Sequence, residues 1–251
     1  MYICIQLNKK QTQLIMKKIL AITIFAVLAL SAQAQKSEQL KVSILGDSYS
    51  TFEGMMQPSW NAIWYFPENS TVSKPNNDVT LVSQTWWHQV AEQMGYKLER
   101  NNSFSGATIC YSGYKDRSGN PGDYSDRSFI GRAGDLGHPD VILVCGGTND
   151  SWSGAPVGEY KWKKWTNEDL YTFRPGMAKM CSELKTLYPK ARIVFILNSE
   201  LRDDINESVH TICRRYHIEC LDLHDIDKQG SHPSIAGMKE FARQVVEFLG
   251  R

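Results

Sequence analysis

The fold of this chain is decided by residues 40–50, Leu-Lys-Val-Ser-Ile-Leu-Gly-Asp-Ser-Tyr-Ser. The first part of the stretch is a short, mostly apolar run, which predicts a buried strand over residues 40–45. The run stops at a Gly-Asp-Ser turn, so Ser48 follows the end of the strand. Because α/β proteins place their chemistry at the carboxyl ends of parallel strands, Ser48 is a candidate nucleophile. The alternative is an ordinary turn, in which Gly and Asp only supply the backbone geometry.

Further apolar runs alternate with amphipathic helical patterns along the rest of the chain. The alternation predicts βαβ units, and therefore a single three-layer α/β/α domain with a mostly parallel sheet of about five strands. The other predicted strands are residues 97–100, 141–145, 191–197 and 219–223, and the predicted helices are residues 84–94, 175–188, 203–216 and 234–249.

A serine nucleophile needs a base within hydrogen-bond reach, because the hydroxyl is weakly nucleophilic at its free pKa. Gly-Ser-His-Pro-Ser at residues 230–234 supplies His232, directly before the last predicted helix. The other histidines lack that placement, and we expect them to be structural. His224 is a reserve candidate because it lies close to His232 in the sequence.

Two further motifs lie between the serine and the histidine. Asn-Asn-Ser-Phe-Ser-Gly at residues 101–106 ends on Gly106, and Gly-Gly-Thr-Asn-Asp at residues 146–150 follows a predicted buried strand. The side-chain amide of Asn149 can therefore be aimed at a developing oxyanion. The alternatives are an Asx-turn or helix cap at Asn149 and a simple bend at Gly106.

The order of these four motifs resembles the SGNH/GDSL hydrolase family, which is named for its Ser, Gly, Asn and His. The resemblance extends over about residues 40–249 and implies a flavodoxin-like fold. It also implies hydrolysis of esters or thioesters, or acyl transfer, without a metal or an organic cofactor. Residues 46–54 are similar to a secreted bacterial branch often found beside carbohydrate-degrading enzymes.

The resemblance also implies a role for each motif residue. Ser48 would be the nucleophile and His232 the general base. The backbone N–H groups of Ser48 and Gly106, together with the side-chain amide of Asn149, would form the oxyanion hole.

The third member of the catalytic triad departs from the family pattern. The family usually has an Asp three residues before the His, and this chain has Gln229 there. A neutral amide can hold the imidazole tautomer but does not stabilise imidazolium as a carboxylate does. We rank Asp227 first as the orienting carboxylate and Asp225 second. A Ser-His dyad supported by a backbone carbonyl is the third alternative.

Three long connections, residues 49–83, 107–138 and 150–174, begin close to the proposed catalytic residues. Long loops in a compact domain are usually functional or disordered. Trp60, Trp64 and Tyr65 lie in the first connection and Trp152 in the third. Each of these rings can pack a small satellite core under a loop, or it can stack on a sugar. We predict that together they form a cleft for a ring-bearing substrate.

Residues 1–34 have the features of a signal peptide with an upstream extension. Lys17 and Lys18 precede an apolar segment at residues 19–30, and Ala-Gln-Ala at residues 32–34 fits the small-residue cleavage rule. We expect the mature domain to comprise residues 35–251 and to be secreted or periplasmic. The apolar segment is shorter than the roughly 20 residues that span a bilayer, so stable membrane insertion after cleavage is not expected. A retained anchor is the alternative.

Composition limits the expected partners. The formal net charge of +1 gives no sign of a nucleic-acid or anionic-membrane partner. No Cys or His group has metal-ligand spacing, so we predict no structural zinc and no obligatory disulfide framework. The family resemblance implies no metal and no cofactor in the reaction. Cys213 and Cys220 could pair across a helix-to-strand turn, but their spacing does not establish it. Nothing in the sequence indicates the oligomeric state.

The expected function is a serine esterase that hydrolyses short acyl esters, above all acetyl esters, on carbohydrate. One alternative is a lipid-directed esterase, lysophospholipase or thioesterase. It would need an apolar acyl channel, and no loop here is a clean aliphatic run. Another is a non-catalytic glycan-binding protein on the same scaffold, with Gln229 as a sign of lost activity.

Overall fold

The computed structural model describes Met16, residues 39–73 and residues 75–251. Residues Leu40–Arg251 form one compact unit. Apart from Met16, the predicted signal peptide lies outside the described residues, so it stays a prediction. None of the helices in the described part of the chain combines the length and apolar character that a membrane span requires.

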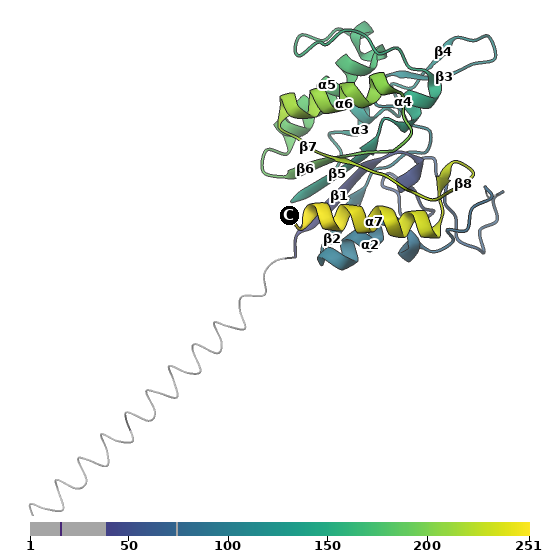
Figure 1. The fold of residues 1–251 in the computed structure, drawn as a ribbon, viewed down its shortest axis with the longest axis vertical. Helices are drawn as coiled ribbons and strands as arrows, with labels where there is room; N and C mark the ends of the chain where they lie inside the picture. The colour runs from purple at the N-terminus through teal and green to yellow at the C-terminus, as the bar shows by residue number, and fades with distance from the viewer. Residues whose placement is uncertain (1–15, 17–38, 74) are drawn as a thin grey trace, which may run out of the picture. The chain divides into compact units, whose positions relative to one another are not determined.

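A parallel five-stranded sheet forms the centre of the unit (Figure 1). Its strand order is β2-β1-β5-β6-β7, and every neighbouring pair is parallel. The strands are β1 (Lys41–Gly46), β2 (Lys97–Asn101), β5 (Val141–Gly146), β6 (Arg192–Leu197) and β7 (Glu219–Asp222). The central strands are buried on both faces, which explains their almost continuous apolar sequences.

Helices cover both faces of the sheet, which confirms the predicted α/β/α architecture. On one face, α2 (Trp86–Met94) lies beside α7 (Ile235–Leu249), and Trp86 stacks on Phe241 with ring centroids 4.5 Å apart. The other face is covered by α3 (Phe129–Arg132), α5 (Phe173–Leu187) and α6 (Asp203–Tyr216). Two separate apolar cores therefore flank the sheet.

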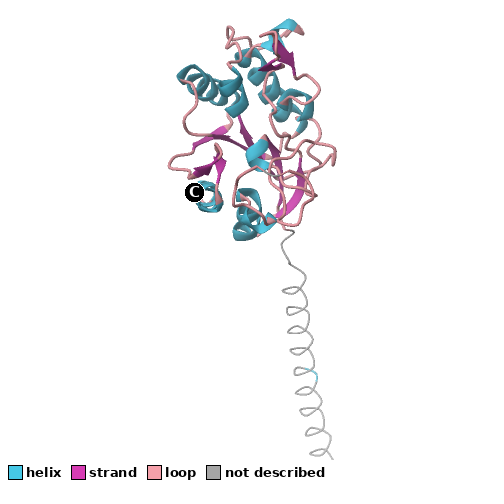
Figure 2. Ribbon diagram, turned by 90° about the vertical axis from the view of Figure 1, so that its right-hand side faces the viewer, coloured by secondary structure: helices cyan, strands magenta, loops and turns pink. Residues whose placement is uncertain are grey.

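Besides α3, several short elements lie outside the sheet and the long helices, most of them in or next to the connections that were predicted as long loops (Figure 2). They are η1 (Ser48–Ser50), η2 (Val82–Gln84), η3 (Glu168–Tyr171), α4 (Thr148–Ser153), the hairpin of β3 (Ser112–Lys115) with β4 (Pro121–Asp123), and the hairpin of β8 (Lys228–Gln229) with β9 (His232–Pro233). Each has six residues or fewer, which is too short for hydrophobic periodicity to reveal it.

Candidate active site

Ser48 stands at the carboxyl end of β1, at the start of η1. The turn needs glycine at position 46, because a Cβ there would lie 2.6 Å from the hydroxyl oxygens of Ser50 and Ser103. The buried Asp47 carboxylate accepts a hydrogen bond from the backbone N–H of Tyr49 at 3.0 Å and so caps the short helix. Burial raises the pKa of Asp47 to about 7.

His232 meets Ser48 across 184 residues of sequence. Its Nε2 lies 2.8 Å from the Oγ of Ser48. Burial lowers the pKa of His232 to about 4, so the ring is neutral at neutral pH. In the neutral ring, Nε2 has a lone pair that faces the serine, so it can accept the hydroxyl proton.

The other ring nitrogen of His232 faces a backbone carbonyl. Nδ1 lies 3.1 Å from the carbonyl oxygen of Gly230. The carboxylate of Asp227 accepts a hydrogen bond from the hydroxyl of Ser234, the N-cap residue of α7. This corrects the first-ranked orienting carboxylate. The residues between Asp227 and His232 form the β8–β9 hairpin, whose turn carries Gly230, rather than Asp227, to the ring.

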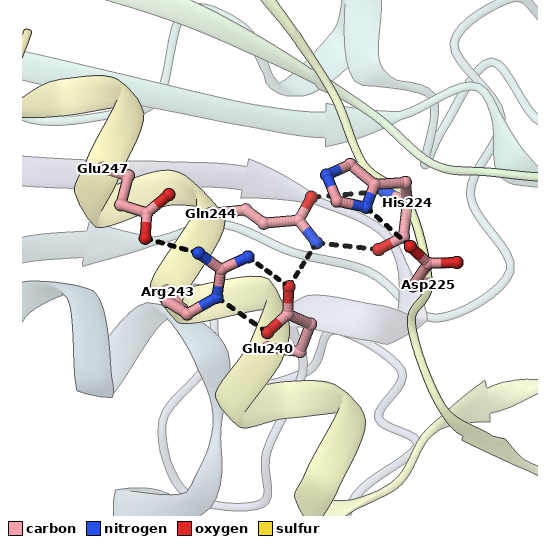
Figure 3. Close-up of polar contacts among 6 residues, drawn as sticks. All are labelled: His224, Asp225, Glu240, Arg243, Gln244 and Glu247. Carbon is pink, nitrogen blue, oxygen red and sulfur yellow. Dashed lines mark hydrogen bonds and ion pairs between the residues drawn. The ribbon is translucent and has the colours of Figure 1, made fainter.

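Asp225 and Gln229 also contact residues other than His232. Asp225 Oδ2 lies 2.9 Å from Nδ1 of His224, beside a polar network on α7 (Figure 3). The backbone of His224 is bound to the side chain of Gln244, and neither member of this exposed pair is among the residues that line the cleft beside Ser48. Gln229 pairs through its side-chain amide with Asp78. The geometry therefore corresponds to the third alternative, a Ser-His dyad with a backbone carbonyl.

Residues of the first long connection hold the histidine loop in place. Tyr49 donates its hydroxyl hydrogen to the carbonyl of Ser231 at 2.7 Å, and Tyr65 donates to the carbonyl of Pro233 at 2.9 Å. Trp64 stacks on the imidazole of His232, with ring centroids 3.6 Å apart and an interplanar angle of 7°. We did not predict these supports, because no local pattern links rings in one loop to a carbonyl far along the chain.

The four aromatic residues predicted to bind substrate have different positions. Trp64 and Trp152 line the cleft beside Ser48, and Trp152 is 41% exposed. The expectation that Tyr65 contacts substrate is wrong. Tyr65 is only 1% exposed, because its ring is buried and its hydroxyl donates a hydrogen bond to the carbonyl of Pro233. Trp60 is 67% exposed and packs edge-on against Phe104, outside the cleft lining.

Gly106 and Asn149 lie beside the serine because three strand ends meet there. The β1–β5 register sets Gly46 opposite Cys145, so the turns after these strands start side by side. The segment after β2 continues along β1, where Phe104 N–H donates to the carbonyl of Gly46 at 3.1 Å. Gly106 has φ +82°, a left-handed conformation that favours glycine.

Two hydrogen bonds orient the side-chain amide of Asn149. Its Nδ2 donates to the carbonyl of Ala107 at 2.9 Å, and its Oδ1 accepts from the hydroxyl of Tyr114 at 2.7 Å. Burial raises the pKa of Tyr114 to about 12, so that hydroxyl remains a donor at neutral pH. An amide nitrogen carries two hydrogens, so one is left to serve a ligand in the cleft.

A buried carboxylate, Asp150, orders the loop that follows Gly106. Its oxygens accept hydrogen bonds from the backbone N–H groups of Ile109 at 2.8 Å and Cys110 at 3.1 Å. Burial raises the pKa of Asp150 to about 6. Asp150 thus connects α4, which carries Asn149, to the loop that carries Gly106.

These groups surround a cleft of about 350 Å³. It is lined by Ser48, Trp64, Ser105, Gly106, Tyr114, Asn149, Trp152, Gly230, Ser231 and His232. A candidate nucleophile with a candidate base, and candidate donors for an oxyanion, therefore face one space. Such an arrangement is suited to acyl transfer.

Comparison with known proteins gives matches over the whole domain. A family model of GDSL-like lipases and acylhydrolases matches residues 40–249. The chain is 51% identical to a protein assigned as a GDSL-like lipase from Bacteroides ovatus ATCC 8483, over 85% of this chain and 99% of that one, with a TM-score of 0.80. For a corresponding protein from Bacteroides uniformis ATCC 8492 the identity is 52%, the coverage 85% and 97%, and the TM-score 0.81.

More distant structures share the fold. A family two carbohydrate esterase from Clostridium thermocellum, in complex with cellohexaose, is 16% identical over 84% of this chain and 64% of that one, with a TM-score of 0.52. No protein of curated function matched the chain.

Proposed function

We propose that this chain, which belongs to the family of GDSL-like lipases and acylhydrolases, is a serine esterase that removes short acyl groups, above all acetyl, from carbohydrate. Membership of the family implies ester hydrolysis in general. The observation that carries the proposal is the 2.8 Å contact between Ser48 Oγ and His232 Nε2, inside a cleft that Gly106 and Asn149 also line.

In the proposed reaction, Ser48 Oγ attacks the ester carbonyl while His232 Nε2 takes the hydroxyl proton. The negative oxygen that forms accepts hydrogen bonds from the N–H groups of Ser48 and Gly106 and from the Asn149 amide. His232 then gives its proton to the departing alcohol. Water repeats the sequence on the acyl-enzyme and releases the carboxylic acid.

The Gly230 carbonyl takes the place of the usual carboxylate in this mechanism. By accepting a hydrogen bond from Nδ1–H, it keeps the lone pair of the neutral ring on Nε2, which faces Ser48. A neutral carbonyl stabilises imidazolium less than a carboxylate does. Orientation of the ring therefore depends on the hairpin backbone and on the stacked Trp64.

The cleft lining supports a small acyl group. The described residues that line it include no Leu, Ile, Val or Met, so this lining offers no aliphatic side chain to a long acyl group. Trp152 offers a partly exposed ring at the same cleft, where a sugar can stack. The structural similarity to carbohydrate esterases is consistent with this choice but concerns the fold alone.

We further propose that the mature protein acts outside the cytoplasm. The support is the sequence of residues 17–34, with two lysines, an apolar segment and Ala-Gln-Ala. N-terminal sequencing of protein recovered from the periplasm or medium tests this; a mature terminus near Gln35 is expected, and an intact terminus in the cytoplasmic fraction would contradict it.

The activity is tested on p-nitrophenyl acetate, butyrate and octanoate with the wild type, Ser48→Ala and Ser105→Ala. Ser105 lines the same cleft, so its variant is a matched serine control. We expect acetate to be the best substrate, with activity lost in Ser48→Ala and retained in Ser105→Ala. Acetylated oligosaccharides are the next substrates, assayed by acetate release.

Other outcomes select the alternatives. A preference for octanoate would replace the proposal with a lipid-directed esterase or thioesterase. Absence of Ser48-dependent release from both the p-nitrophenyl esters and the acetylated oligosaccharides, with retained binding of the deacetylated sugar, would favour a glycan-binding protein.

A further inference from the structure

A cluster of three potential metal ligands lies at the β7 edge of the sheet, outside the catalytic cleft lining. It consists of His210 on α6 and of Cys220 and Asp222 on β7. Alternate residues of a strand point to the same face, so Cys220 and Asp222 lie together. The ligand atoms of all three residues lie within 4.8 Å of one another.

The separations within this cluster are close to those of ligands that share one ion. His210 Nε2 lies 3.3 Å from Asp222 Oδ1, and Cys220 Sγ lies 3.9 Å from the same oxygen. With usual zinc bond lengths, two ligands of a tetrahedral ion are roughly 3.3–3.7 Å apart. Little movement is therefore needed for the three atoms to bind one ion.

The chemistry of the ligands favours zinc. A thiolate, an imidazole and a carboxylate form a mixed set that suits Zn²⁺, whereas Mg²⁺ and Ca²⁺ prefer oxygen ligands alone. The half-buried Cys220 carries a free thiol rather than a disulfide. A simple ion pair between His210 and Asp222 would not require a sulfur ligand beside it.

We propose that His210, Cys220 and Asp222 bind Zn²⁺, with a water molecule in the fourth position. The exposed side of Asp222 leaves room for that water. On binding, the Cys220 thiol loses its proton to solvent and its sulfur donates an electron pair to the ion. The metal would cross-link α6 to the edge strand β7, and it takes no part in the ester reaction.

The test is zinc titration of the reduced mature protein against a chromophoric chelator. We expect one zinc ion per chain, and an affinity lowered by more than about tenfold in Cys220→Ser and in His210→Gln. The matched control is His224→Gln, because His224 forms a comparable exposed pair with Asp225 without a thiol (Figure 3). Unchanged ester hydrolysis in each variant verifies that it is folded.

Cobalt substitution supplies a second readout, since a Co²⁺–thiolate bond gives a charge-transfer band that should vanish in Cys220→Ser. Cys213→Ala removes the possible disulfide partner of Cys220 and should still bind one ion. No zinc binding by the reduced wild type, or binding unaffected by Cys220→Ser, would overturn the proposal. A Cys213–Cys220 disulfide that persists in reductant and excludes zinc would overturn it as well.

Discussion

The two sides of the catalytic cleft are built differently. On the serine side, Ser48, Gly106 and Asn149 follow the ends of sheet strands, and the buried carboxylates Asp47 and Asp150 cap their loops. On the histidine side, His232 stands on a hairpin of two-residue strands, and a backbone carbonyl orients its ring. The hydroxyl groups of Tyr49, in η1 next to Ser48, and of Tyr65, both far from the hairpin in the sequence, hold that hairpin.

This difference predicts that mutations on the two sides of the cleft impair catalysis in different ways. Serine-side geometry is set by the sheet register and by hydrogen bonds to buried carboxylates. Histidine-side geometry depends on side-chain contacts between residues far apart in the sequence. We therefore expect substitutions behind the histidine to change catalysis through the position of the ring. Substitutions at the proposed oxyanion donors should act on the transition state directly.

The largest effect is expected from His232→Ala, which removes the base. We expect kcat/KM for p-nitrophenyl acetate to fall by about 10⁴-fold or more. The control is His224→Ala, which removes an exposed histidine near the same hairpin and should leave kcat/KM unchanged. Comparable losses in the two variants would contradict the assignment of His232.

The next largest effect is expected at the oxyanion donor on the serine side. Asn149→Ala removes the amide donor without adding a negative charge, and kcat should fall by about 10²–10³-fold. KM should change little, because the lost interaction forms in the transition state. Steady-state kinetics, with circular dichroism to verify folding, provide the measurement. A changed KM with an unchanged kcat would assign Asn149 to substrate binding instead.

The pH dependence of kcat/KM reports on the histidine side. Protonation of His232 blocks proton transfer, and burial lowers the pKa of this group to about 4. We therefore expect the acid limb of kcat/KM that is due to His232 to lie well below the ordinary histidine pKa of about 6.5. A limb at that ordinary value, without the unfolding that protonation of the buried Asp47 or Asp150 could cause, would contradict this expectation.

Removing one tyrosine hydroxyl on each side of the cleft compares the two sides directly. Both substitutions should have smaller effects on kcat than Asn149 substitution. Tyr65→Phe leaves the Pro233 carbonyl without its donor and should lower the free energy of unfolding by about 1–3 kcal/mol, with a severalfold loss of kcat. Tyr114→Phe removes the hydrogen bond to Asn149 Oδ1 and should lower kcat severalfold with a smaller change in stability, because Tyr114 is only half-buried. Urea unfolding and steady-state kinetics on both variants test whether Tyr65→Phe loses more stability than Tyr114→Phe. Equal losses in the two variants would contradict the prediction.

The smallest effect is expected from Gln229→Asp, which restores the carboxylate at the usual family position. The Gln229 side chain pairs with Asp78, away from the ring of His232, so the new carboxylate should not reach Nδ1. We expect no gain in kcat. A gain of tenfold or more, about 1.4 kcal/mol, would mean that the hairpin rearranges around the new charge.

Sequence reasoning was accurate where a local pattern carries the structure. All five sheet strands and the four longest helices were predicted, because buried runs and amphipathic periodicity are local properties. It also identified Ser48 as a candidate nucleophile and His232 as a candidate base, and the structure brings the two side chains into contact. It ranked a backbone carbonyl only third as the ring partner of His232, behind Asp227 and Asp225, since the fold of a short hairpin decides whether Asp227 or Gly230 reaches the imidazole.

The sequence by itself determined the parallel α/β architecture and the residues that end its strands, because each follows from neighbouring side chains and turn-forming residues. Only the tertiary structure decided which groups meet across the cleft and at the sheet edge. The stack of Trp64 on His232 and the approach of His210 to Cys220 join residues on different elements. Such contacts depend on how helices and loops pack against the sheet, and sequence spacing does not encode those distances.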